Sequence, residues 1–207
     1  MNITSPRRAG PAGQGRHGPR MGVSRLTIPV LAAAFLIGLV KGAVGYAHRS
    51  PVPEPHVAGT NAITVHVVLA VVAAATAIAI QAWRSRRSQP GPSPWSAPFS
   101  SNAIARMGRT MRLSRAAAAA RLLPTALLIL VLLYCPYRMG AQVIGGLDPN
   151  STVNAWGGPS YAGALLAHWL DCVIGFCVAA FLLGRLLAPA SSQAGGRGQP
   201  PSSGGDS

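Results

Sequence analysis

Residues 63–83 read ITVHVVLAVVAAATAIAIQAW, an apolar stretch in which His66 is the one ionisable side chain. At about 1.5 Å per residue, a helix of this length is ~30 Å long and matches the hydrocarbon core of a bilayer. Backbone groups inside lipid have no water to bond, so a helix that satisfies its own hydrogen bonds is the natural way to cross. The stretch therefore predicts a transmembrane helix.

Three more runs are long and apolar enough to cross in the same way. They are residues 26–47, about 121–139, and 161–187. The third span is the shortest; Pro124 lies one turn inside its start, where a kink is tolerated, and Arg121 can extend to the headgroups. We predict an all-α bundle of four transmembrane helices, formed by a membrane domain of residues 25–187.

The composition agrees with a small polytopic bundle. Of 207 residues, 49% are hydrophobic and only 11% are charged, which is unusual for a soluble domain. Eighteen Lys and Arg oppose four Asp and Glu, giving a formal charge of +14. Such a charge is typical of proteins that bind nucleic acid or anionic lipid, and of basic segments that set membrane topology. The distribution of the charges along the chain must distinguish these possibilities.

The cations are concentrated in two places. The N-terminal segment holds Arg7, Arg8, Arg16, Arg20 and Arg25, and the loop 84–120 holds Arg84, Arg86, Arg87, Arg106, Arg109, Arg112 and Arg115. The other two connections hold one each, Arg49 and Arg138. Since cytoplasmic loops retain Lys and Arg, both termini and the basic loop should be cytoplasmic and the loop 140–160 external. We expect a multi-pass protein of a bacterial-type cytoplasmic (inner) membrane.

Both ends of the chain are rich in Gly, Pro and Ser. Residues 1–24 and 188–207 have few large apolar side chains and are predicted to be disordered tails. Met21 is an alternative start. The first span could instead be a cleaved signal peptide, but 22 residues exceed the usual apolar core of such a peptide and Lys41 interrupts its end.

The basic loop has two parts. Residues 88–101 are a Pro-rich linker, whereas Asn102–Ala120 lacks Pro and is rich in Ala and Arg. The second part could be an amphipathic helix on the inner leaflet or a solvated extension of the third span. On the first reading the contacts to anionic lipid headgroups are Arg106, Arg109, Arg112 and Arg115. Nucleic-acid binding is not expected, because no recognised module accompanies the charge.

Four ionisable side chains stand out inside the spans, because placing such a group in a bilayer costs about 2.5–3.5 kcal/mol on insertion scales. They are Lys41, His66, His168 and Asp171. Each shares a helix face with the small residues of its span, where helices approach closely, and all four belong to the outer half of the bundle. We predict a buried ion pair between Lys41 and Asp171, with the histidines as hydrogen-bonding neighbours. This cluster either fixes helix packing or forms a site for a substrate, a proton or a cofactor.

Metal and cofactor signals are weak. Cys135, Cys172 and Cys177 have no zinc-type spacing, and Cys172 and Cys177 point about 140° apart on one helix, so they should act as small hydrophobes. No metal site is expected. The cofactor alternative is haem b with His66 and His168 as axial ligands, although no larger set of paired histidines supports it.

The longest external connection is dense in turn formers and carries Trp156 near the headgroup level. It is either a lid over the polar cluster or an ordered surface loop.

No G-x-S-x-G, phosphate-loop or H-E-x-x-H motif is present, so an enzyme is not expected. The sequence favours an accessory or interaction protein that binds a membrane protein or a second copy. The alternative is a carrier of a small ligand, an ion or proton, or haem b.

Overall fold

The computed structural model describes residues 24–87, 93, 95–101, 103–111 and 115–187. The predicted tails, apart from Ser24, lie outside the described residues. The predicted all-α class is confirmed, and four helices are long and apolar enough to cross a membrane, as the four predicted spans require. The helices are α1 (Thr27–Ala47), α2 (Ile63–Arg86), the 3-10 helix η1 (Ala97–Phe99), α3 (Ala103–Met111), α4 (Arg115–Gly145), α5 (Pro149–Thr152) and α6 (Tyr161–Leu186).

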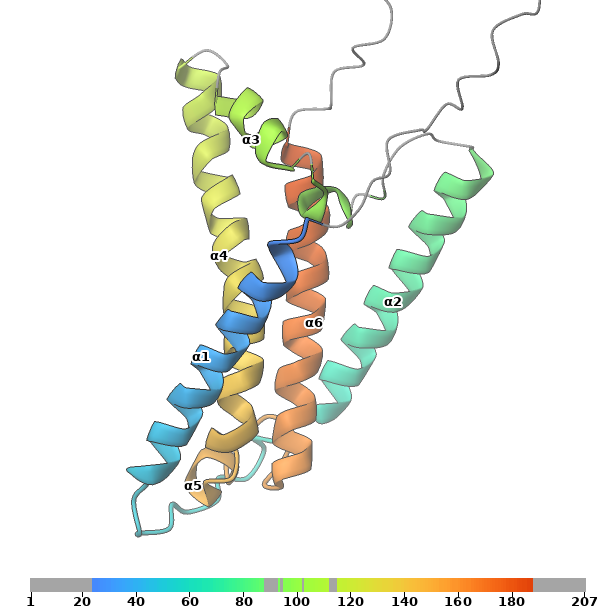
Figure 1. The fold of residues 1–207 in the computed structure, drawn as a ribbon. Helices are drawn as coiled ribbons and strands as arrows, with labels where there is room; N and C mark the ends of the chain where they lie inside the picture. Colours follow the sequence, from blue (N-terminus) through green and yellow to red (C-terminus); the bar gives the residue numbers. More distant parts are fainter. Residues whose placement is uncertain (1–23, 88–92, 94, 102, 112–114, 188–207) are drawn as a thin grey trace, which may run out of the picture.

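The four long helices run antiparallel in chain order (Figure 1). α1 packs along α4, α4 packs against α6, and α2 contacts α6, so α4 and α6 form the centre. α2 lies close to α6 at the end that carries α5 and leans away from it toward the other end (Figure 1). We call the end with α5 the outer end and the opposite end the inner end, following the predicted orientation.

The helix α4 is longer than the predicted third span. It continues through Pro124 and Pro136 and ends at Gly145, six residues beyond the predicted boundary at Met139. Residues 140–145 include two glycines and Gln142, so their hydropathy does not mark a span, yet α1 covers them. Tertiary packing therefore sets this helix end.

Glycines bring α1 and α4 into backbone contact. A Cβ added at Gly38 would overlap the carbonyl oxygen of Tyr137, and one added at Gly140 would overlap that of Phe35. Such close approach is typical of helix pairs in membranes, where apolar side chains gain little by leaving lipid.

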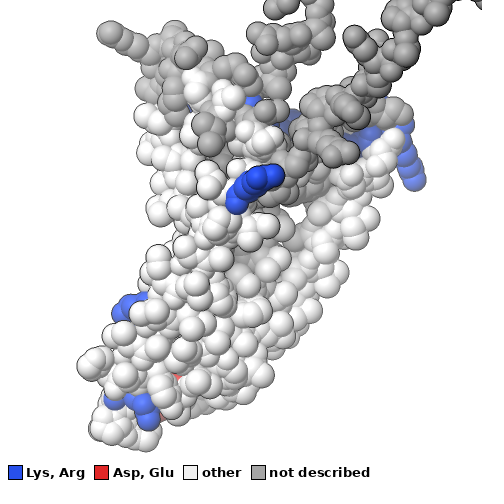
Figure 2. Space-filling view, viewed as in Figure 1, with Lys and Arg blue, Asp and Glu red and all other residues white. Residues whose placement is uncertain are grey.

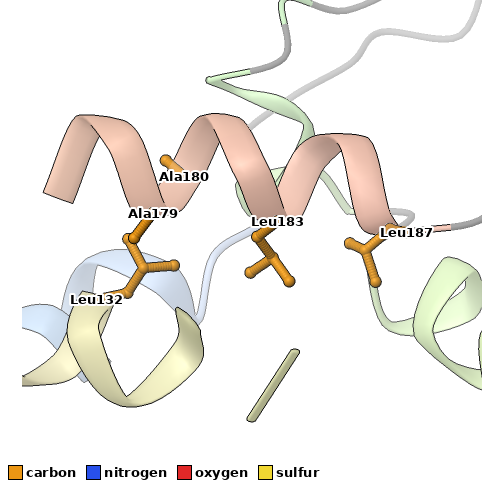
Figure 3. Close-up of a cluster of buried hydrophobic side chains, with 5 residues drawn as sticks. All are labelled: Leu132, Ala179, Ala180, Leu183 and Leu187. Carbon is orange, nitrogen blue, oxygen red and sulfur yellow. The ribbon is translucent and has the colours of Figure 1, made fainter. Parts of the chain in front are cut away.

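The inner half of the bundle has a small apolar core between α4 and α6. It consists of Leu132, Ala179, Ala180, Leu183 and Leu187 (Figure 3). Phe99 of η1 packs on this core and stacks against Phe176, with ring centroids 5.6 Å apart. Met107 of α3 packs on it too, so η1 and α3 close the inner end.

Charged side chains are sparse over the middle of the molecule in the space-filling view, where most Lys and Arg atoms lie toward its two ends (Figure 2). Lipid-facing residues such as Ile37, Val71 and Leu130 are widely exposed in the isolated chain. An apolar belt between two more polar ends is the surface that a bilayer requires.

Candidate functional site at the outer end

A histidine and an aspartate join α2 to α6. His66 lies in the first turn of α2 and is 5% exposed. Its Nε2 is 3.1 Å from Oδ2 of Asp171 on α6, and its Nδ1 is 2.8 Å from the carbonyl oxygen of Ala62. The Asp171 side chain is 40% exposed. The imidazole ring is therefore held at both nitrogens.

The two contacts fix the orientation of the imidazole ring. A carbonyl oxygen can only accept, so the Nδ1 of His66 donates in its bond to Ala62. The Nε2 of His66 and the Oδ2 of Asp171 are 3.1 Å apart, within hydrogen-bond distance. We call this pair of His66 and Asp171 the clasp between α2 and α6.

The connection between α5 and α6 covers this clasp. The ring centroids of Trp156 and His66 are 5.8 Å apart. The backbone carbonyl oxygen of Trp156 accepts a hydrogen bond from the backbone N–H of Ala62 at 2.7 Å. A Cβ on Gly157 would overlap the carbonyl oxygen of Gly163 in α6, so the connection lies directly on that helix. The residues around Trp156 therefore lie against His66 and α6.

The connections 48–62 and 146–160, both at the outer end, are also bonded to each other, which the sequence did not indicate. Asn150 accepts from the N–H of Glu54 at 2.9 Å and donates to the carbonyl of Val52 at 2.8 Å. Asn154 accepts from the N–H of Val57 at 2.7 Å. These bonds make one cap from two loops that are about 100 residues apart.

The second histidine lies one turn from Asp171. His168 is half-buried on α6, within electrostatic range of Arg138, Asp171 and His66. Arg138, which the sequence placed at the external connection, is two turns inside α4. The outer cluster therefore consists of His66, Arg138, His168 and Asp171 on three helices.

The predicted pair of Lys41 and Asp171 does not form. Lys41 lies on an exposed face of α1, and among the described residues the ion pair of Asp171 is with His66. The physical reason is the order of the helices: α1 docks on α4 through Gly38 and Gly42, and α4 separates it from α6. Lys41 lies beside that packing face, so it does not point toward the cluster.

The haem alternative meets a geometric obstacle. The imidazole of His66 already has a partner at each nitrogen, so ligation of iron would require it to leave Ala62 or Asp171. The described contacts therefore favour the bonds of His66 to Ala62 and Asp171 over coordination of iron.

Of the four arginines expected at anionic lipid, Arg106 points into the bundle. It is 8% exposed, and its guanidinium donates to the carbonyl oxygens of Gly184 and Leu187 at 3.1 Å each. It thus satisfies the carbonyls at the end of α6. For Arg109 and Arg115 the structure describes only the backbone, on α3 and α4, and Arg112 lies outside the described residues.

Comparison with known proteins gives no assignment: no family model, no curated protein and no solved structure matches the chain.

Proposed function

We propose that this protein is a non-catalytic, multi-pass protein of the cytoplasmic membrane that works through helix association, with α2 as the association helix and a second copy as its partner. The observation that supports this proposal is the way α2 is held: the clasp at His66 and the bond from Ala62 to Trp156 are both at its N-terminal end. From there α2 leans away from α6 (Figure 1).

The inner part of α2 carries small residues on the face that continues from His66, along the stretch where α2 leans away from α6 (Figure 1). His66 is the buried residue of α2, and the half-buried positions that follow it at heptad spacing are Ala70, Ala73, Ala77, Ile80 and Arg84. Small residues at such spacing let two helix backbones approach closely, the usual basis of helix association in lipid. Ala73 and Ala77 form the small-xxx-small pair.

A second copy is the partner that fits this face best. Two copies inserted in the same orientation place their α2 helices parallel, and a two-fold axis along the membrane normal brings Ala73 and Ala77 against their equivalents. The same surface on both copies is then self-complementary.

Cysteine cross-linking in native membranes tests the association. In a chain with the three natural cysteines replaced by alanine, Ala73→Cys and Ala77→Cys should each give a disulfide-linked dimer on mild oxidation. Ala75→Cys and Ala79→Cys, on the opposite face of the same helix, are the matched controls and should not. Equal cross-linking on both faces, or none on either, would contradict the proposal.

The proposed topology follows the arginine distribution. We expect reporter fusions after residues 20, 95 and 195 to report the cytoplasm and fusions near residues 55 and 150 to report the outside. The basic loop 84–120 would then face the cytoplasm, where its arginines can contact anionic headgroups. An external signal at residue 95 would overturn this arrangement.

A second function, the carriage of a proton or a small ligand at the outer cluster, is favoured by the contact between His66 and Asp171 beside the ring of Trp156. Its haem b form is tested by the visible spectrum of the purified protein. A split band on reduction would support haem, and a colourless protein would remove it.

A further inference from the structure

An apolar cavity of about 330 Å³ lies at the inner end and is lined by residues of α1, η1, α3, α4 and α6. A second apolar cavity, of about 210 Å³, lies between α4 and α6. The second cavity is lined by seven residues, of which four carry sulfur. They are Cys135 and Met139 from α4 and Cys172 and Cys177 from α6. The other lining residues are apolar, so the side-chain atoms that could bind a metal ion in this cavity are sulfur atoms.

Two of these thiols lie together. Cys135 and Cys172 are 5% and 7% exposed, and both line this cavity, one from α4 and one from α6. The Sγ of Cys135 lies against α6 at Gly175, 3.7 Å from where a Cβ would be. Gly175 thus leaves room for this sulfur beside Cys172, which lies one turn away on the same helix.

Met139 adds a third sulfur to this pair. It follows Cys135 by four residues on α4, so both side chains lie on the same face of the helix. Two thiols and one thioether from two helices form a set of soft donors in a cavity with an apolar lining.

We propose that Cys135, Cys172 and Met139 bind one soft monovalent cation, Cu(I). Thiolate and thioether sulfur select Cu(I), whereas Mg²⁺ and Ca²⁺ require oxygen donors that this cavity lacks. Binding forms two Cu–S bonds to thiolates and releases the two thiol protons, with no change of oxidation state. The resulting complex carries one negative charge, and Arg138 lies within electrostatic range of Cys172 to offset it.

Cys177 is not a ligand in this proposal. Within the part of the chain that the structure describes, no three His, Cys, Asp or Glu side chains are placed to hold one metal ion. Cys177 is also exposed, in contrast to the buried pair. It therefore serves as a matched control, with the same residue type lining the same cavity.

The test is metal binding by the purified, reduced full-length protein in detergent, with Ag(I) as a redox-inert probe and Cu(I) supplied under a competing chelator without oxygen. We expect one equivalent of either ion. Cys135→Ser and Cys172→Ser should weaken binding by more than about 100-fold, since even losing an outer-shell partner costs 10–100-fold. Met139→Leu should weaken it less, and Cys177→Ser should leave it unchanged.

Two measurements separate a lost ligand from a lost fold. Thermal unfolding of each metal-free variant should match that of the parent, and Cys135→Ala and Cys172→Ala provide second variants if a serine variant fails this check. X-ray absorption of the copper complex should show sulfur donors. The proposal is overturned by a Cys177→Ser variant that loses binding equally, by uptake that no cysteine variant reduces, or by nitrogen or oxygen donors in the absorption spectrum.

Discussion

Replacing either His66 or Asp171 alone by leucine is expected to lower the stability of the bundle by about 2–3 kcal/mol. Removing one member of a fully buried pair typically costs about 3–5 kcal/mol, because the remaining charge is left without a partner. We expect the lower value because the Asp171 side chain is 40% exposed. The loss should be measured as unfolding in mixed detergents, followed by circular dichroism.

The double replacement His66→Leu with Asp171→Leu should recover much of that loss. Two apolar side chains can substitute for a buried pair, and a strong coupling in the double-mutant cycle would show that the two residues interact. Additive losses would show that the clasp contributes nothing as a pair.

Lys41→Met provides the contrast. Lys41 is exposed on α1 and has no ion pair in the described structure, so its removal should leave stability within about 0.5 kcal/mol. A coupling between Lys41 and Asp171 as large as that between His66 and Asp171 would mean that α1 and α6 are neighbours, contrary to this arrangement.

The four spans were predictable because each depends on local properties, length and continuous hydropathy. The end of α4 was not, since residues 140–145 are helical through contact with α1 rather than through their own hydropathy. The same limit applies to α3: Arg106 looks like a surface arginine in sequence, but the end of α6, about 80 residues away, provides its acceptors.

The candidate site was likewise predictable only in part. Helical phase placed His66, His168 and Asp171 on the small-residue faces of their spans, and the structure brings these three together at the outer end. Phase and depth do not say which helices are neighbours, however, so the partner of Asp171 was wrongly taken to be Lys41. The order of packing is a property of the whole chain.

The interface that sets this order gives the second large effect. Gly38→Ala and Gly140→Ala are each expected to destabilise the protein by about 3 kcal/mol, the upper part of the usual range for overpacking. The added Cβ would overlap the carbonyl oxygens of Tyr137 and Phe35 respectively. A backbone carbonyl inside a helix cannot rotate away, so α1 and α4 must separate along their length.

Because either substitution alone forces that separation, the double variant Gly38→Ala with Gly140→Ala should lose less than the sum of the two. Gly45→Ala is the matched control on α1: a Cβ there meets nothing within 4 Å. Alanine is favoured over glycine within a helix by roughly 0.5–1 kcal/mol, so this control should be neutral or stabilising. The same change would thus have opposite signs seven residues apart on one helix. Thermal unfolding in detergent decides the point, and equal stability of the Gly38 and Gly45 variants would show that α1 does not dock on α4 through its glycines.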